Sequence, residues 1–165
     1  MSQELYEDIV NAQNISDTNS TETDYSTSTW LTFSAGNKKY AIQSNLIQEI
    51  LRNNDIFPIP FVPPYIKGVL NSYGTPYAVL DISLFLENEI QNSKLFMILK
   101  GDYHTAIQIT DLQEFHTLND IEIQDFIDEK NVRFFSSVIS YQGESIPIMN
   151  VDAILSTIRE EIEKI

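Results

Sequence analysis

The chain has 165 residues, a hydrophobic content of 42% and no cysteine, so it can bury a core but can form neither a disulfide nor a thiolate metal site. Its formal net charge is −14, and its ten lysine and arginine residues are scattered, which argues against a nucleic acid as partner because phosphates require clustered positive charge. The N-terminal residues lack the basic and apolar segments of a signal peptide, and no apolar stretch is long enough to cross a bilayer, so we expect a cytoplasmic protein without direct membrane insertion.

Residues 1–29 form an acidic segment with few apolar side chains. The segment holds six acidic residues and no lysine or arginine, and Ser, Thr, Asn, Asp and Gln dominate it from residue 11 onward. Burial of so little apolar surface cannot offset the entropy lost when the chain becomes ordered. We therefore predict a disordered acidic tail over 1–29 and a folded domain over 30–165.

The first half of the folded region has the pattern of short β-strands separated by turns. Four prolines crowd together at positions 58, 60, 63 and 64, and proline donates no backbone hydrogen bond, so residues 55–66 are expected to form an irregular extended crossing. A helical turn is expected at 83–88. The predicted strands, rich in β-branched and aromatic residues, are 30–35, 38–43, 46–52, 67–74 and 75–82.

The second half repeats this order of elements. Residues 119–131 lie between its strands and are expected to form a loop or a short helix. A C-terminal helix is predicted at about 152–164, and the isoleucines at positions 154, 158, 162 and 165 should share the face that packs on the domain. The predicted strands are 94–101, 103–110, 112–117, 132–143 and 144–151. Strands this short and regular favour small barrels or a sandwich over a parallel α/β sheet.

Four of the five glycines form two pairs that indicate a duplication. When Gly36 is aligned with Gly101, an Ala-Ile-Gln tripeptide that follows each of them also aligns. When Gly74 is aligned with Gly143, the apolar positions of two further hairpins come into register after a short insertion. Self-similarity with a long period indicates one structural unit built twice.

The duplication sets the expected organisation of the domain. We predict a first copy at about 30–90 and a second copy at about 91–152, with Gly36, Gly74, Gly101 and Gly143 in turns. Two copies packed side by side leave a groove between them, and grooves are the usual sites of partner binding.

No arrangement of residues points to catalysis or to a metal. No metal-ligand spacing joins His104 and His116 to carboxylates, and both are expected to be ordinary surface or edge histidines. The acidic residues between 120 and 129 lack the spacing and the central glycine of a calcium loop, so they are expected to form a solvated face. Neither a nucleophile elbow nor a phosphate-binding loop is present. The sequence therefore predicts no enzyme, no cofactor and no metal.

The same repeated segments resemble the CheW family of chemotaxis coupling proteins. The family typically has a Tyr-Ala-Ile strand, a Val-x-Glu-Ile strand, a Pro-rich crossing that ends in Tyr-Ile-x-Gly-Val, an Asn-Leu-Arg-Gly turn and a Pro-Val-x-Asp-Leu hairpin. The likeness runs from Trp30 to about Leu155. The corresponding segments here are Tyr40-Ala41-Ile42, Ile47-Gln48-Glu49-Ile50, residues 58–69, Asn71-Ser72-Tyr73-Gly74 and Val79-Leu80-Asp81-Ile82.

This resemblance implies an all-β fold of two small SH3-like five-stranded β-barrels side by side, with a C-terminal α-helix. It also implies a non-catalytic adaptor that couples the cytoplasmic tip of methyl-accepting chemotaxis receptors to the regulatory domain of a CheA-type histidine kinase. Two alternatives remain: a CheW-like scaffold of a non-chemotactic sensory or motility system, and a small-ligand-binding β domain.

The resemblance further suggests Ile47, Glu49, Gly68 and Tyr73 as receptor-binding residues. Alternation along a strand should place Ile47, Glu49 and Leu51 on one face, as a groove wall, and Ile50 on the core face. Like the other glycines, Gly68 is otherwise expected to occupy a turn or a close approach of the backbone.

Tyr73 stands where the family keeps an arginine, so its receptor contact must rely on a ring and a hydroxyl instead of a charged fork. We expect Tyr73 to be exposed and reachable from the groove that holds Glu49; the competing view is that it packs into the core. The pair Phe61 and Tyr65 is expected to pack under the Pro-rich crossing.

Overall fold

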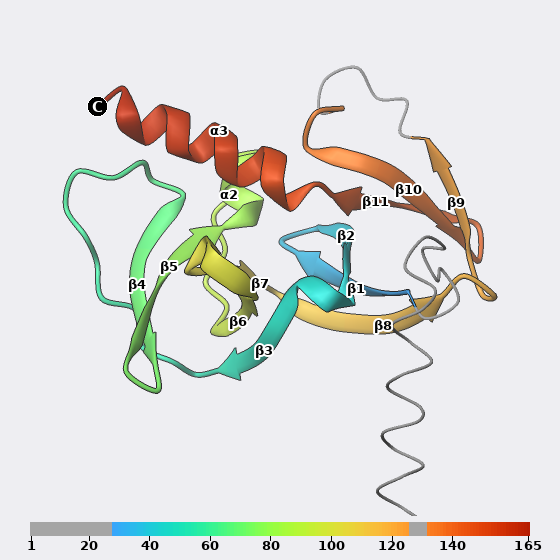
Figure 1. Cartoon of the computed structure of the whole chain (residues 1–165), viewed down its shortest axis with the longest axis horizontal. Coiled ribbons are helices and arrows are strands. Elements are labelled where there is room, and N and C mark those ends of the chain that lie inside the picture. Colours follow the sequence, from blue (N-terminus) through green and yellow to red (C-terminus); the bar gives the residue numbers. More distant parts are fainter. Residues whose placement is uncertain (1–27, 126–131) are drawn as a thin grey trace, which may run out of the picture.

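The computed structural model describes residues 28–125 and 132–165 (Figure 1). Apart from its last two residues, the predicted tail lies outside the described residues, as does the end of the predicted 119–131 loop. Thr29, which we expected in the tail, is already the first residue of a strand.

Eleven strands of the described residues form two sheets. One sheet has six strands in the order β8-β1-β2-β11-β10-β9, and the other has five in the order β3-β6-β7-β5-β4. The strands of the first sheet are β1 (Thr29–Ala35), β2 (Lys38–Gln43), β8 (Asp111–Thr117), β9 (Glu122–Asp125), β10 (Phe135–Tyr141) and β11 (Glu144–Met149). Those of the second are β3 (Ile47–Arg52), β4 (Ile66–Ser72), β5 (Thr75–Asp81), β6 (Leu95–Leu99) and β7 (Thr105–Ile109). The predicted fold class is confirmed.

Each sheet contains strands from both halves of the sequence. The join is a parallel pair in each case: Ala41 of β2 lies opposite Ile148 of β11, and Val79 of β5 lies opposite Ala106 of β7. Under the alignment of the two repeats, β6, β7, β8, β10 and β11 correspond to β1, β2, β3, β4 and β5. The five shared strands then have the same order in both sheets: third, first, second, fifth and fourth. In each sheet, the first and second strands come from one repeat, and the third, fourth and fifth come from the other.

Three apolar clusters hold the sheets together. One lies inside the curl of the six-stranded sheet and includes Trp30, Ile139 and Ile148, and a second lies inside the five-stranded sheet. Because the second cluster takes contacts from both edge strands, β3 and β4, that sheet curls into a barrel. The largest cluster lies between the two sheets and includes Phe33, Tyr40, Met97 and Ile109.

The sixth strand comes from the segment predicted as a loop or short helix. In the first repeat, Phe57 of the Pro-rich crossing exchanges two backbone hydrogen bonds of 2.8 Å with Val69 of β4. In the second repeat, Gln124 of β9 lies opposite Val138, the counterpart of Val69. Pro58 and Pro60, which follow Phe57, limit the crossing to one bridge. The second repeat has no proline there, and a four-residue strand forms.

Corresponding helices follow β5 and β11. Helix α2 (Ile82–Glu87) begins where the Asp81 carboxylate accepts a hydrogen bond from the Leu84 N–H, and α3 (Val151–Glu163) begins where the Asn150 side chain accepts one from the Ala153 N–H. These are ordinary N-caps, and the two capping residues correspond in the repeat alignment. Two single-turn 3-10 helices complete the fold, η2 (Ser44–Leu46) and η3 (Gly101–Tyr103).

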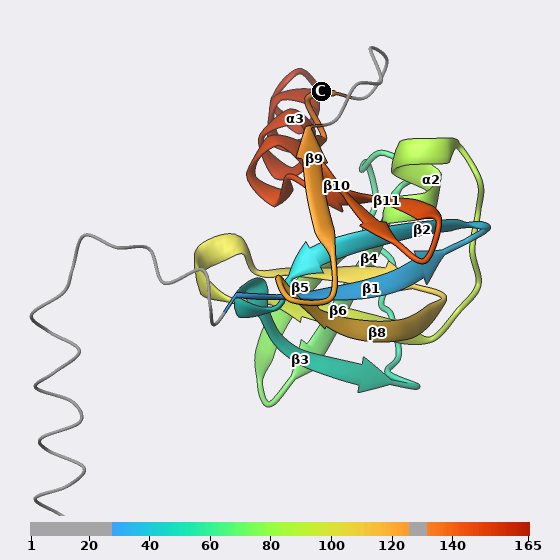
Figure 2. The ribbon, with the colours of Figure 1, turned by 90° about the vertical axis from the view of Figure 1, so that its right-hand side faces the viewer.

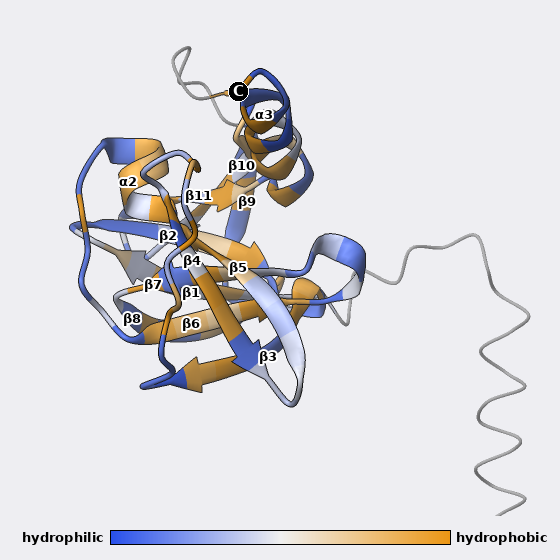
Figure 3. Cartoon of the chain, turned by 90° about the vertical axis from the view of Figure 1, so that its left-hand side faces the viewer, coloured by the Kyte–Doolittle hydropathy of each residue, from blue (hydrophilic) through white to orange (hydrophobic). Residues whose placement is uncertain are grey.

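Helix α3 crosses over the five-stranded sheet and has its C-terminal end at the outer side of the molecule (Figure 1). It carries both hydrophobic and hydrophilic residues (Figure 3). Ile154 and Ile158 are buried in the cluster between the sheets, as predicted. The prediction is wrong for Ile162 and Ile165, which are 43% and 77% exposed because the end of the helix extends beyond the core that buries Ile154 and Ile158.

Candidate interaction surfaces

The open seam of the five-stranded barrel lies between its edge strands β3 and β4, and side chains close it. The Ser72 hydroxyl on β4 donates a 2.9 Å hydrogen bond to the Glu49 carboxylate on β3. The adjacent Gln48 amide donates a longer 3.4 Å hydrogen bond to the Tyr77 hydroxyl on β5. We call these four residues the β3–β4 seam. The seam holds Glu49 half-buried in a fixed position at the surface.

Tyr73 follows Ser72 directly and is 97% exposed, so the view that it packs into the core is wrong. Tyr73 and Gly74 have φ values of 49° and 83°, which place both central residues of this two-residue turn in the left-handed region, as in a type I′ turn. The Asn71 side-chain oxygen accepts a 2.9 Å hydrogen bond from the Gly74 N–H and fixes the turn further. The turn therefore projects the Tyr73 ring into solvent beside the β3–β4 seam.

The predicted face of β3 is wrong for Ile47. The pairing of β3 with β6 shifts register between Ile47 and Glu49, which is a β-bulge at Gln48. A bulge inserts one residue and reverses the alternation beyond it. Ile47 therefore packs with Ile50 on the cluster between the sheets, whereas Glu49 and Leu51 face the inside of the five-stranded barrel.

Gly68 is buried and offers no surface to a partner. Its φ is 144°, and a β-carbon at this position would lie 2.2 Å from the carbonyl oxygen of Phe57. Only glycine permits so close an approach of the Pro-rich crossing to β4. Gly68 can therefore influence receptor binding only indirectly, by allowing the Pro-rich crossing to lie close to β4.

The four other glycines lie in connections between strands. Gly36, Gly74 and Gly143 occupy two-residue turns of antiparallel hairpins, and Gly101 begins η3 between β6 and β7. Gly143 and the preceding Gln142 have φ values of 79° and 48°, nearly the same as their counterparts Gly74 and Tyr73.

The Pro-rich crossing exposes an aromatic ring that we expected to be packed. Phe61 is 91% exposed and has a φ of 63°, so the expectation of packing is wrong for this residue. Tyr65 does pack, edge to face on Phe85 with 5.0 Å between ring centroids, and its hydroxyl donates a hydrogen bond to Glu161 of α3. Burial, aided by that hydrogen bond, raises the pKa of Tyr65.

An apolar groove of about 360 Å³ runs between α3 and the five-stranded sheet. A smaller cleft of about 280 Å³ continues from it toward the six-stranded sheet, and Tyr103 lines both. The Tyr103 hydroxyl donates a hydrogen bond to Asp152, which together with burial raises the pKa of Tyr103. Apolar side chains of the main groove include Ile66, Leu80, Leu155, Ile158 and Ile162.

None of the four predicted receptor-binding residues lines this α3 groove or the cleft. The structure brings Glu49 and Tyr73 together at the β3–β4 seam, away from the groove, and separates Ile47 and Gly68 from them. The sequence contained one signal for the groove, the isoleucine stripe that continues to the end of α3, but nothing that pointed to Tyr103.

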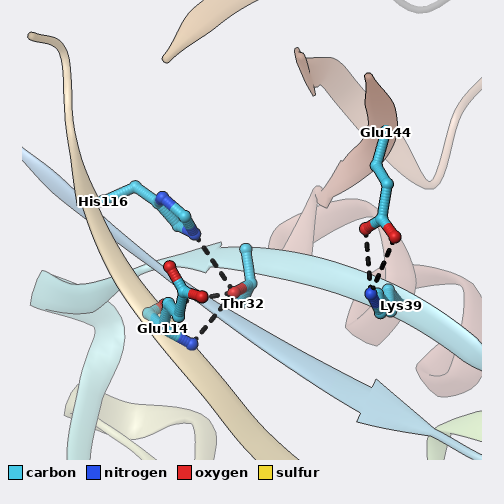
Figure 4. A network of polar contacts seen from close by, with 5 residues as sticks. All are labelled: Thr32, Lys39, Glu114, His116 and Glu144. Atoms are coloured by element: carbon cyan, nitrogen blue, oxygen red, sulfur yellow. Dashed lines mark hydrogen bonds and ion pairs between the residues drawn. The ribbon is translucent and has the colours of Figure 1, made fainter. Parts of the chain in front are cut away.

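The six-stranded barrel has a polar pocket beside its edge strand β8. Figure 4 shows the polar contacts among five residues that line it. The Thr32 hydroxyl lies 3.3 Å from the His116 Nε2 atom and bonds both the N–H and the carbonyl of Glu114, at a shift in register between β1 and β8. His116 is only 3% exposed and its ring meets the edge of Tyr141, so its expected place at the surface is wrong although β8 is an edge strand.

Among the described residues, no group of histidine and carboxylate side chains is arranged to hold a metal ion. No helix in the described part of the chain is both long and apolar enough to span a membrane.

Comparisons with known proteins agree with this architecture. The scaffolding protein TtCheW from Thermoanaerobacter tengcongensis has a similar fold, with a TM-score of 0.65 and 19% sequence identity over 74% of this chain and 88% of that chain. No curated protein sequence matches the chain. The family model of the CheW-like domain matches residues 29–159, which cover both sheets and most of α3. On the strength of that match, which includes both repeats, the chain belongs to the CheW-like domain family.

Proposed function

We propose that this chain is a non-catalytic adaptor that couples chemoreceptors to a CheA-type histidine kinase. The observation that carries the proposal is the presence of two separate candidate binding surfaces on one rigid pair of barrels. Figures 1 and 2 show α3 and the turn between β4 and β5 on opposite sides of the five-stranded sheet. The helix borders the groove, and the turn holds Tyr73. An adaptor needs such an arrangement because it must hold two partners at once.

The β3–β4 seam and Tyr73 form the receptor-binding surface in this proposal. Tyr73 adds about the area of one aromatic side chain to a contact, and Glu49 adds a carboxylate that Ser72 holds in place. Since the ring carries no charge, receptor binding should depend on burial more than on salt. The α3 groove, with its apolar floor, leaves a second surface free for another partner, and a groove of this kind suits an amphipathic helix.

Tyr73 also favours one variant of this function. Where relatives keep an arginine, this chain presents a ring, so its receptor can differ from those of ordinary coupling proteins. A CheW-like scaffold of a non-chemotactic sensory or motility system is therefore the second candidate, and it uses the same surface.

The test measures binding of a receptor-tip fragment and of a kinase regulatory domain to the wild type and to three variants. Tyr73→Ala should weaken receptor binding by about tenfold, the loss of roughly 1–2 kcal/mol of aromatic contact, and should leave kinase binding intact. Tyr73→Arg should shift preference toward the receptors of ordinary coupling proteins. Phe61→Ala is the control, because it removes an equally exposed ring from another residue with positive φ, and it should leave receptor binding unchanged.

The wild type should also hold the receptor fragment and the kinase domain in one ternary complex. Indistinguishable receptor titrations for the wild type, Tyr73→Ala and Tyr73→Arg would show that Tyr73 is not part of the receptor-binding surface. Absence of binding to any receptor tip or kinase domain would contradict the adaptor function itself.

A further inference from the structure

The seam of the six-stranded barrel contains the counterpart of the Glu49–Ser72 pair. In the repeat alignment, Glu114 of β8 corresponds to Glu49 of β3, and Tyr141 of β10 corresponds to Ser72 of β4. Ser72 hydrogen bonds to Glu49, whereas the Tyr141 hydroxyl accepts a 3.1 Å hydrogen bond from the Gln142 side-chain amide. The negative charge of Glu114 still acts on Tyr141, because it contributes, after burial, to the raised pKa of the Tyr141 hydroxyl.

The two seams differ in the space around the carboxylate. Beside Glu114 lies a pocket of about 140 Å³, bordered by His116, Tyr141, Gln142 and Glu144. Drug-sized ligands and cofactors occupy cavities of about 300 Å³ or more, so this pocket has room for one side-chain head group and not for a large ligand. Its lining includes acceptor groups and an aromatic ring at the surface of the barrel.

The charges at the pocket do not balance. Lys39 is engaged with Glu144 through contacts of 2.9 and 3.1 Å, which accounts for one carboxylate (Figure 4). The Glu114 carboxylate is exposed and pairs with no cation among the ion pairs of the described residues. Burial and then the negative charges of Glu114 and Asp120 raise the pKa of Tyr141, so the local field at the pocket is negative.

We propose that this pocket, formed by Glu114, Tyr141 and Gln142 at the seam of the six-stranded barrel, receives an arginine side chain presented by a protein partner. A guanidinium group supplies paired donors that match a carboxylate and a planar face that stacks on an aromatic ring. Lysine satisfies the charge but neither the pairing nor the stacking, so arginine binds better. The net charge of −14 adds a long-range attraction for a basic partner.

The contact would be an additional one, separate from both surfaces of the proposed adaptor function. It needs neither Tyr73 nor the α3 groove, and it lies on the other barrel from the β3–β4 seam.

The test follows the ring signals of Tyr141 and His116 by NMR while the full chain is titrated with N-acetyl-arginine amide. The lysine and citrulline analogues are the comparison probes, and citrulline matches arginine in shape without its charge. We expect saturable shifts with arginine, weaker binding with lysine, and no saturation with citrulline over the same concentrations. Added salt should weaken the arginine binding, because the carboxylate is close to solvent.

Two variants locate the binding site. Glu114→Gln keeps the shape of the side chain but removes the charge, and it should raise the dissociation constant by about fivefold. Glu49→Gln makes the same change at the other seam and should leave the constant unchanged. Tyr141→Phe keeps the ring, removes the hydroxyl that bonds to Gln142 and provides a second variant if Glu114→Gln fails to fold; it should weaken binding less.

Equal shifts with arginine and citrulline would overturn the proposal, as would an unchanged dissociation constant in Glu114→Gln together with Tyr141→Phe. A loss of binding in Glu49→Gln would place the site at the wrong barrel and would also overturn it. No receptor or kinase enters this experiment, so its result is independent of the adaptor function.

Discussion

Tyr73 and Ile47 show what local sequence can and cannot establish about a single residue. The Tyr-Gly pair between two strands favours a tight turn, and a residue at such a turn has no neighbours on its outer side, so the exposure of Tyr73 follows from the sequence. The burial of Ile47 does not. It depends on a β-bulge at Gln48, and the bulge arises from pairing with β6, which is remote in the sequence.

Glu49 was proposed from family resemblance and Glu114 from its place in the structure, although the duplication makes them equivalent. His116 was expected to be a surface or edge histidine because only its position near a strand end was visible; it lies on the edge strand β8 but is buried. Its burial comes from Thr32 and Tyr141, which belong to strands on either side of the seam. Contacts across a seam join distant parts of the chain and leave no local pattern.

Gly68 and Gly74 provide a prediction at this scale. Gly68→Ala should lower the free energy of unfolding by about 3 kcal/mol or more, because the new methyl group meets the Phe57 carbonyl and the backbone is already strained for an L-residue. Gly74 has a φ of 83° but open space around it. Gly74→Ala should therefore lower the free energy of unfolding only by the backbone strain of about 1 kcal/mol. Urea denaturation of both variants measures the difference; equal losses would mean that the crossing moves away from β4 without cost.

At the scale of elements, the strands were predictable because alternation and turn residues delimit them. The crossing was also predictable, since four prolines exclude a ladder. The failure was β9. Its four residues are all exposed, so no buried face gives them an alternating pattern, and only the backbone of β10 draws them into a strand. A strand added at an edge by backbone pairing alone has little sequence signature.

Helix α3 was predicted within a residue at each end, but burial changes along its length. Ile154 and Ile158 are buried in the cluster between the sheets, whereas Ile162 borders the α3 groove and is partly exposed. Periodicity identifies which residues share a face of the helix, but the length of surface beneath that face depends on the whole fold.

Ile158 and Ile162, one helical turn apart on α3, should respond differently to the same substitution. Ile158→Ala should cost about 2–4 kcal/mol of unfolding free energy, because it leaves a cavity in the cluster between the sheets. Ile162→Ala removes the same atoms from a side chain that is 43% exposed and should cost about 1 kcal/mol or less. Thermal or urea unfolding of the pair tests this, and a larger loss for Ile162→Ala would show that the end of α3 is held more tightly than its exposure implies.

For the whole molecule, the sequence revealed two copies but not how they combine. The repeat alignment is a comparison of residue types, and it would be the same whether each copy closed its own barrel or lent strands to the other. The structure shows the second arrangement, in which the parallel pairs β2–β11 and β5–β7 join the halves. Partner choice between strands far apart in the sequence is set by the complete set of packing contacts, which no single segment contains.

Because every sheet uses both halves, the two barrels should unfold together. Trp30 is the only tryptophan and is buried inside the six-stranded barrel, so its fluorescence reports on that barrel alone. Amide exchange of β6 and β7 reports on the five-stranded barrel. We expect both measurements to give the same free energy of unfolding, as in a two-state protein. Two separate transitions would indicate that one barrel survives without the other.

The exchange of strands also sets an order of assembly while the protein is being synthesised. Proteins emerge from the ribosome with the N-terminal end first. The strands of the five-stranded barrel are all available once β7 has emerged, whereas β2 must wait for β11, the last strand made, before it gains its second neighbour. The first hairpin to appear is thus among the last to be enclosed. Until then its apolar side chains, Trp30 and Phe33 among them, have no complete core to enter, and the nascent chain is most in need of a chaperone at the end that was made first.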